Sequence, residues 1–286
     1  MNNIQTTRYG AIIKSLPMTF GKVFFVLNST DTYGIAEFSA QFPNDSDGVP
    51  RVYIGTTETP IQAAIDACVS GRGDVVYIFG SFTITTPILV NKKGISIIGG
   101  NAKGTNTGGN TSITSNVNAS AVFTVSVDDV LMSDIRMTCG TGTGTVIGID
   151  MSDVALNNCT FRNMRIVKSG GTDNSGIAIK AGSPTSCTFE DILIEGASGK
   201  EWASGLLIVA GNGLLVKGLH VCGVNATGVT DAASTMSVFR ELVIYSDVGV
   251  GTEITGATSC IINTRNFATS EGTSTAKQAN ILTDGE

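Results

Sequence analysis

The chain has 286 residues, enough for one large domain, and a formal net charge of -6 with only 15% charged residues. It contains no basic cluster, which argues against a surface that binds phosphate or nucleic acid. Glycine is abundant, at 35 residues, alongside many β-branched, Asn and Ser residues. This composition favours an all-β class with many short strands joined by turns.

Residues 1–57 differ from the rest of the chain and predict a small N-terminal module. They contain an apolar strand at 23–27, a loop rich in Pro, Asp and Gly at 42–50, and a second short strand at 51–54. The start of the chain lacks the pattern of a signal peptide, and no apolar run approaches the about 20 residues of a membrane span. We therefore expect synthesis in a cytosol, with the six cysteines as free thiols.

One amphipathic helix is predicted over residues 59–70, within a segment 58–74 that we interpret as a cap and turn. Thr59 is expected to cap the helix, and Gly71 and Gly73 to end it. A single helix before a repeat array predicts a cover over the first coil, because an open solenoid end exposes core and sheet edge. The apolar face would comprise Ile61, Ala64, Ile65, Cys68 and Val69.

An internal repeat begins near residue 111 and predicts the fold. Each unit has apolar residues at its first, third, sixth and eighth positions, with a bend at the fourth and fifth, and a second short strand upstream. This alternation, with a period of 23 to 29 residues, is typical of β-helix coils. We predict an all-β fold, a right-handed parallel β-helix over residues 75–269, followed by a polar C-terminal tail at 270–286. The central apolar residues are Met132, Phe161, Phe189, Val216, Phe239 and Ile262.

The first position of the repeat predicts an interior column that contains three cysteines. We interpret these cysteines as small buried hydrophobic side chains. A disulfide between Cys159 and Cys187 fits the geometry of neighbouring coils, but cytosolic synthesis favours free thiols. The predicted column is Val130, Cys159, Cys187, Leu214, Ser237 and Cys260.

Side chains that could carry chemistry are few and scattered. His220 is the one histidine, is predicted to point outward, and has only Cys222 near it in sequence, which makes no metal site. Residues 99–104 follow a strand but precede no helix, which argues against a phosphate loop. The tripeptide Arg72-Gly73-Asp74 matches an integrin-binding motif, but a helix-ending turn accounts for it better. We predict no catalytic, cofactor-binding or metal-binding residues.

Acidic side chains are the candidates for sugar chemistry, because glycosidases use paired carboxylates. Asp134 and Asp191 share one repeat position, with Asn163 between them, which places the carboxylates roughly 10 Å apart. The column would either hold a saccharide or form a turn ladder of Asp and Asn. No Arg or Lys clusters beside these acids in sequence, which favours the turn ladder and a protein that is not an enzyme. The other acidic candidates are Asp128, Asp129, Asp150, Asp153 and Glu190.

Five segments between residues 21 and 78 carry a family resemblance. They read GKVFFV at 21–26, FPNDSDGV at 42–49, RV at 51–52, IQAAIDACV at 61–69 and GRGD at 71–74. Together they resemble the N-terminal part of a group of tailed-bacteriophage virion proteins. Those proteins look like head-decoration, head-fibre or tail-spike subunits with a pectin-lyase-like β-helix. No catalytic motif of the enzymatic members carries over to this sequence.

The resemblance implies a protein of the virion surface, a structural protein, and a homotrimer. We expect a capsid-attached decoration or head-fibre protein that binds the major capsid protein, or another virion protein, through residues 1–57. The alternative is a tail spike or tail fibre that binds a host surface glycan, with or without polysaccharide-degrading activity. A third hypothesis, a stand-alone polysaccharide lyase or hydrolase, is disfavoured by the missing signal peptide. No cofactor, nucleic acid or membrane partner is expected.

Overall fold

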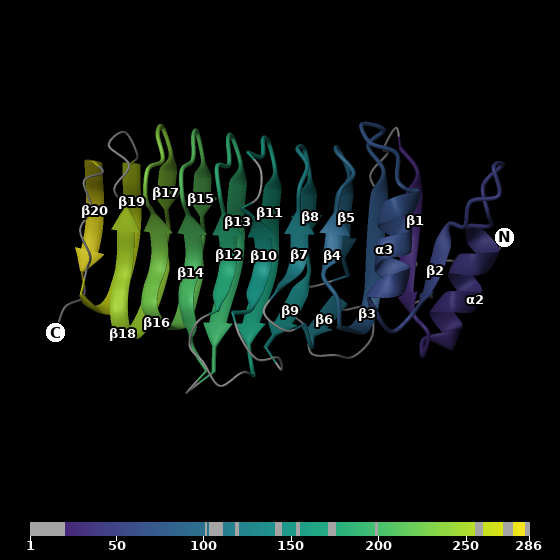
Figure 1. Ribbon diagram of the computed structural model, residues 1–286, viewed down its shortest axis with the longest axis horizontal. Helices are drawn as coiled ribbons and strands as arrows, with labels where there is room; N and C mark the ends of the chain where they lie inside the picture. The colour runs from purple at the N-terminus through teal and green to yellow at the C-terminus, as the bar shows by residue number, and fades with distance from the viewer. Residues whose placement is uncertain are drawn as a thin grey trace.

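The chain folds into one continuous solenoid. The computed structural model describes residues 21–100, 102, 111–117, 120–140, 145–152, 155–170, 176–197, 200–254, 260–270 and 277–283, with backbone alone from residue 246 onward. All pairings between its strands are parallel, and the strands form an all-parallel β-solenoid of about seven turns with two short helices. From residue 75 onward the coils follow one another in sequence order along the long axis (Figure 1). The predicted fold class is confirmed.

Three walls, here called A, B and C, run along the solenoid, and each coil between residues 75 and 254 passes through all three. Wall A contains, in spatial order, β2 (Val52–Gly55), β1 (Val23–Asn28), the first half of β3 (Val75–Ile84), β5 (Ser96–Gly99), β8 (Leu131–Ser133), the first halves of β11 (Thr160–Lys168) and β13 (Thr188–Gly196), β15 (Leu215–Lys217), β17 (Val238–Arg240), the start of β19 (Cys260–Ser270) and β20 (Lys277–Thr283).

Walls B and C complete each coil. Wall B contains the second half of β3, β6 (Thr111–Ser115), β9 (Arg136–Cys139), the second halves of β11 and β13, the first parts of β16 (His220–Asp231) and β18 (Val243–Ile254), and the second parts of β19 and β20. Wall C contains β4 (Ile88–Val90), β7 (Ala121–Val125), β10 (Ile147–Met151), β12 (Ile177–Ala181), β14 (Trp202–Ile208) and the second parts of β16 and β18.

A column of apolar side chains runs the length of wall A inside the solenoid. Each member is the register partner of the next, and each is fully buried. The rings of Phe161 and Phe189 stack with centroids 5.4 Å apart. This column confirms the predicted stack from Met132 to Phe239 and extends it by three coils toward the N-terminus. Its members are Phe24, Val76, Ile97, Met132, Phe161, Phe189, Val216 and Phe239.

The predicted register is wrong by one residue after Phe239. The partner of Phe239 is Ile261, not Ile262, and Cys260 pairs with Val238 instead of joining the column of Ser237. The last coil is one residue shorter than the sequence pattern indicated. The prediction failed here because apolar and polar residues alternate poorly over 260–267, which leaves the register weakly defined.

Two columns of left-handed corners bracket wall A. Each of five consecutive coils has two residues, five positions apart, whose φ lies between 49° and 62°. The bend predicted at the fourth and fifth repeat positions falls on the second of these corners. The first corner column is Gly73, Gly94, Asp129, Asn158, Ser186, Gly213 and Met236, and the second is Asp134, Asn163, Asp191, Gly218 and Glu241. Asn and Asp are the non-glycine residues that tolerate this conformation best.

The helix α3 (Glu58–Ala67) closes the N-terminal end of wall C. The side-chain amide of Gln62 donates to the Leu89 carbonyl at 3.1 Å and accepts from the Leu89 N–H at 2.8 Å, as a neighbouring strand would. The capping role is therefore supported, but the predicted bounds were wrong. Thr57, not Thr59, is the N-cap, because Glu58 and Thr59 are already helical. Val69 lies beyond the helix and is half exposed.

A second helix, α2 (Thr32–Gln41), was not predicted. It covers the outer face of wall A, where Phe38 packs against Phe25 and Phe79 with ring centroids 4.7 and 5.7 Å apart. Because β1 pairs with both β2 and β3, the described part of the N-terminal module is continuous with the solenoid.

The far end of the solenoid also differs from expectation. The segment expected as a polar tail contains β20, which pairs with β19 and adds a last strand to wall A. Both helices of the described residues are too short to cross a membrane.

We expect Phe189→Ala to lower the free energy of unfolding by about 3–5 kcal/mol, because it leaves a cavity in the interior column. Thr188→Ala is the matched control, since the neighbouring side chain points out of wall A and is only partly buried. Urea unfolding followed by circular dichroism gives both values. Equal stability of the two variants would contradict the assigned register.

Candidate functional site

The predicted acidic column lies at the second corner of each coil. Asp134, Asn163 and Asp191 occupy consecutive corners, as the repeat predicted. The Asn163 side-chain amide donates to the Asp134 carboxylate, and the Asp134 N–H donates to the Arg162 carbonyl at 3.3 Å. The two alternatives for this column were a saccharide site and a turn ladder of Asp and Asn, and these bonds are those of a turn ladder.

A recess interrupts this corner column where Gly218 follows Asp191. A Cβ atom on Gly218 would lie 2.4 Å from Oδ1 of Asp191, so the carboxylate occupies the space that a side chain would need. The recess has a volume of about 360 Å³ and is lined by Asp191, Ile192, Leu193, Gly218 and His220. His220 points outward and is exposed, as predicted, between its register partners Leu193 and Val243.

Basic side chains lie closer to these acids than the sequence indicated. Arg162, Glu190 and Lys217 are register partners on consecutive coils, and Lys217 Nζ lies 3.1 Å from Glu190 Oε1. Arg165 forms an ion pair with Glu195 on the next coil. These cations neighbour Glu190 and Glu195, because coil stacking brings together residues 27 to 30 positions apart. Ion pairs this exposed contribute little to stability.

The acids at the first corner are also engaged. Lys93 Nζ lies 3.3 Å from carboxylate oxygens of both Asp128 and Asp129. The backbone N–H of Asn157 donates to Asp128 at 2.9 Å and, with smaller effects of Lys93, holds the pKa of Asp128 below its usual value. The side chain of Asn158 donates to Asp129 at 3.1 Å.

One further acidic candidate lies apart from the corners. Asp150 accepts hydrogen bonds from the N–H and hydroxyl of Ser152, which is a local turn. Asp153 lies outside the described residues. Within the described ranges, no three His, Cys, Asp or Glu side chains lie close enough to bind a metal ion.

A buried carboxyl group was missed by the sequence analysis. Asp231 is fully buried at the end of wall C, where its register partner on the preceding coil is Ile208. Burial raises the pKa of Asp231, and hydrogen bonds from Ser234 oppose that rise. The N–H of Ser234 donates to Asp231 Oδ1 at 3.0 Å, so the carboxyl group turns the chain at this coil.

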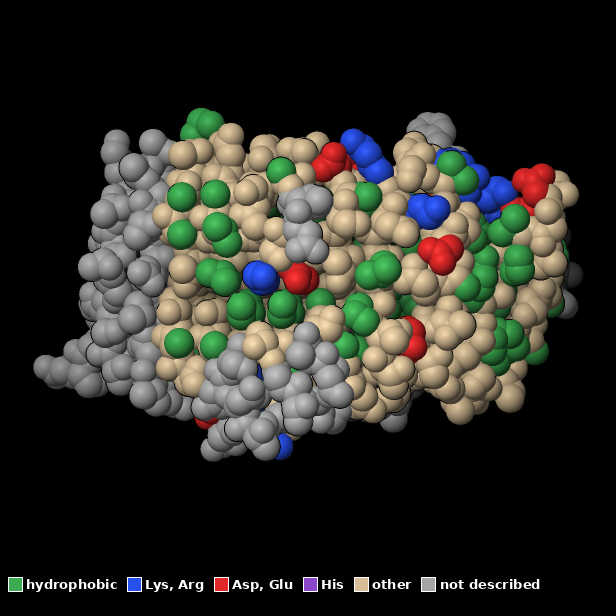
Figure 2. Space-filling model, viewed as in Figure 1, with side chains coloured by type: hydrophobic (Ala, Val, Ile, Leu, Met, Phe, Trp, Pro, Cys, Tyr) green, Lys and Arg blue, Asp and Glu red, His purple; other side chains and the backbone are tan. Residues whose placement is uncertain are grey.

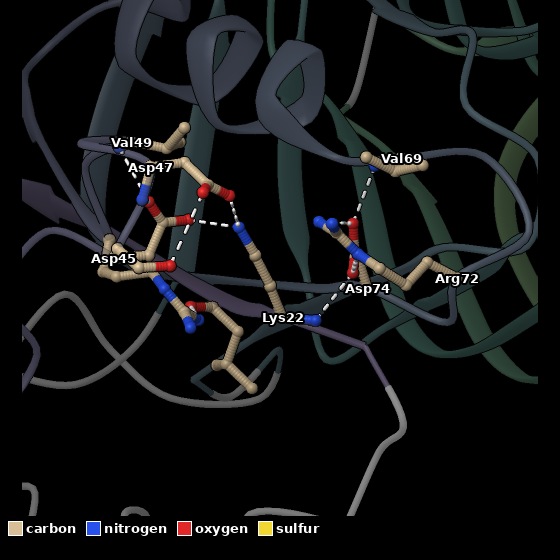
Figure 3. Close-up of polar contacts among 10 residues, drawn as sticks. Lys22, Asp45, Asp47, Val49, Val69, Arg72 and Asp74 are labelled. Carbon is tan, nitrogen blue, oxygen red and sulfur yellow. Dashed lines mark hydrogen bonds and ion pairs between the residues drawn. The ribbon is translucent and has the colours of Figure 1, made fainter.

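The tripeptide Arg72-Gly73-Asp74 is part of a polar junction at the N-terminal end (Figure 3). Asp74 is fully buried and accepts from the Arg72 guanidinium through both oxygens at 2.6 Å, and from the N–H groups of Lys22 and Val69 at 2.6 and 2.7 Å. Burial alone would raise the pKa of Asp74, but these bonds hold it below its usual value. The motif forms the predicted turn between the helix and β3, and Asp74 also joins this turn to β1. Its carboxylate is inaccessible to a receptor.

A hollow lies beside this junction. The Lys22 ammonium forms an ion pair with Asp45, whose carboxylate also accepts from the N–H groups of Asp47 and Val49 at 3.0 and 2.8 Å. These bonds fix the loop between α2 and β2. The hollow has a volume of about 430 Å³ and is lined by Gly21, Val23, Gln41, Phe42, Pro43, Asn44, Asp45 and Arg51.

The outer surface of the shaft is mixed in character. Figure 2 shows apolar side chains scattered over one face, with acidic and basic side chains lying next to each other. Near the N-terminal end, Tyr33 and Ile54 are 59% and 46% exposed, and Met236 at the first corner is 67% exposed.

Comparison with known proteins shows a likeness in fold. No protein-family model and no curated protein matches the chain. Among solved structures, the chain is similar to ORF18 of Geobacillus virus E2, with 14% sequence identity and a TM-score of 0.52. The match covers 94% of this chain and 53% of the viral chain, so the present chain spans about half the length of that relative. At this identity the likeness shows a shared β-solenoid fold.

We expect Gly218→Ala to destabilise the protein more than Gly213→Ala. Both glycines have φ near 60°, which costs an L-residue about 1–2 kcal/mol, but only Gly218 lies against a carboxylate. Urea unfolding measures both variants, and the double variant Asp191→Ala/Gly218→Ala should recover the excess loss. If Gly213→Ala costs as much as Gly218→Ala, the recess is not shaped by Asp191.

Proposed function

We propose that the protein is a structural component of a bacteriophage virion, attached to the capsid as a decoration or head-fibre protein that projects the solenoid outward. The observation that carries this proposal is the all-parallel solenoid that 94% of the chain shares with a protein of Geobacillus virus E2. The resemblance of residues 21–78 to phage virion proteins supports it independently.

The N-terminal end of the shaft is the proposed attachment surface. This end carries both helices, the hollow beside Asp45 and the exposed side chains Tyr33 and Ile54. Its loop is fixed by the ion pair of Lys22 with Asp45, which favours a preformed docking surface. The partner is the major capsid protein or another virion protein.

We further propose a homotrimer. A thin shaft has a large surface for its volume, yet only 15% of the residues are charged. Half-buried and exposed apolar side chains on the outside, such as Ile147, Ile177 and Val209, need a second surface. Closed cyclic symmetry supplies that surface without open polymerisation. The number three comes from the family resemblance.

A tail spike that binds host glycan is the second candidate. The recess lined by Asp191 and His220, with the ion pairs of Lys217 and Arg165 beside it, favours this alternative. In either location we propose that the protein is not an enzyme, because hydrogen bonds already commit Asp134 and Asn163 to the corner ladder.

Attachment is tested with particles from a phage whose copy of this gene carries a stop codon. We expect the wild-type protein to bind these particles on the head by immunogold labelling, and Tyr33→Ala/Ile54→Lys to lose binding while remaining trimeric in light scattering. Met236→Ala is the matched control, since it removes an equally exposed apolar side chain from a distant corner. Label on the tail would favour the spike, and full binding by the double variant would place attachment elsewhere.

Catalysis is tested with polysaccharide from the host surface. We expect no release of reducing ends or unsaturated sugars after prolonged incubation with the wild-type protein. Asp134→Asn and Asp191→Asn serve as comparisons. Product release that disappears in either variant would overturn the structural role and establish a depolymerase.

A further inference from the structure

Two interior cysteines face each other on neighbouring coils. Cys159 and Cys187 each lie one residue before a strand of wall A, and the residues that follow them, Thr160 and Thr188, are register partners. Both cysteines are fully buried. The backbone N–H of Cys159 lies 3.4 Å from Sγ of Cys187, so the Cys187 side chain reaches toward the coil that contains Cys159.

The spacing of the two coils suits a covalent link. Neighbouring parallel strands lie about 4.8 Å apart, and disulfides join Cα atoms about 4.4–6.8 Å apart. All five cysteines whose side chains are described are free thiols, and Cys159 and Cys187 are the pair among them that the register stacks directly.

We propose that Cys159 and Cys187 are a redox-sensitive pair that a peroxide converts into a disulfide, which staples two successive coils of the shaft. The corner residues Asn157 and Asn158 are exposed, so the pair lies one residue inside the surface. A small oxidant such as hydrogen peroxide has the shortest route to it there.

Hydrogen bonding within the pair prepares one sulfur for attack. Hydrogen bonds from the Cys159 thiol and N–H lower the pKa of Cys187, and the same pairing raises that of Cys159. Burial instead raises the pKa of Cys68 and of Cys139 to about 12. Because the thiolate is the reactive form, Cys187 is the expected nucleophile and the isolated cysteines are expected to be inert.

The reaction balances with one equivalent of peroxide. The Cys187 thiolate attacks one peroxide oxygen, the O–O bond breaks, and the products are Cys187 sulfenic acid and hydroxide. The Cys159 sulfur then attacks the Cys187 sulfur, the S–S bond forms and the S–O bond breaks. The departing hydroxide takes the Cys159 proton as water. The proton first lost by Cys187 converts the hydroxide of the first step into water. Two thiols and one hydrogen peroxide thus give one disulfide and two waters.

Formation of the disulfide would depend on the redox conditions of the compartment. A reducing cytosol keeps the pair open during folding and stacking, and an oxidising exterior closes it. The link closes a loop of one full coil, because the two cysteines lie 28 positions apart. Closing a loop of this length restricts the unfolded chain, and for a domain of this size we expect a rise in Tm of about 5 °C.

The test treats the full-length protein with hydrogen peroxide under native conditions. We expect the thiols titrated after denaturation to fall from six to four, and mass spectrometry of unreduced peptides to show Cys159 joined to Cys187. The mass of the chain on a non-reducing gel should stay that of a monomer. The rise in Tm should disappear on addition of a reductant.

Matched variants isolate the pair. Cys187→Ser should abolish the cross-link and the rise in Tm, whereas Cys139→Ser, which removes another fully buried thiol, should retain both. Six unreacted thiols, oxidation of Cys187 beyond the sulfenic acid without a cross-link, or a link between other cysteines would each overturn the proposal. Peptide mapping of the wild-type protein decides it even if Cys187→Ser fails to fold.

Discussion

One geometric constraint governs this structure: every coil must return the chain to the same place one strand spacing, about 4.8 Å, further along the axis. The column from Phe24 to Phe239 meets this constraint with fully buried apolar side chains in eight positions. The corners meet it in the backbone, since left-handed residues turn the chain at both ends of wall A. The helix α3 closes the end of wall C, where the first coil has no neighbouring strand to cover it.

The corners explain why polar residues gather in columns. Asp and Asn adopt the left-handed conformation more readily than other non-glycine residues, and each then bonds to its counterpart on the next coil. The pairs Asp134 with Asn163 and Asp129 with Asn158 follow this pattern. The turning of the chain is therefore enough to explain a row of acidic residues in such a solenoid, and the row by itself does not indicate catalysis.

The sequence predicts the parts of the fold that repeat and misses those that occur once. The interior column and the outward position of His220 follow from alternation within each unit. The helix α2 escaped prediction because one buried aromatic side chain, Phe38, holds it against the sheet, which leaves little periodic signal. The cations Arg162 and Lys217 escaped because they adjoin the acids only after stacking. The buried Asp231 has no counterpart in the repeat that would have marked it.

The direction of the backbone hydrogen bonds has a mechanical consequence. In all three walls these bonds run between coils and hence along the axis, so a force that pulls the C-terminal end away would load the bonds of one coil at a time. Among the described strands, β20 pairs with β19 alone, whereas β1 is held between β2 and β3 and overlaid by α2. Under tension the shaft would peel from its C-terminal end in steps of one coil, and the N-terminal end would give way last.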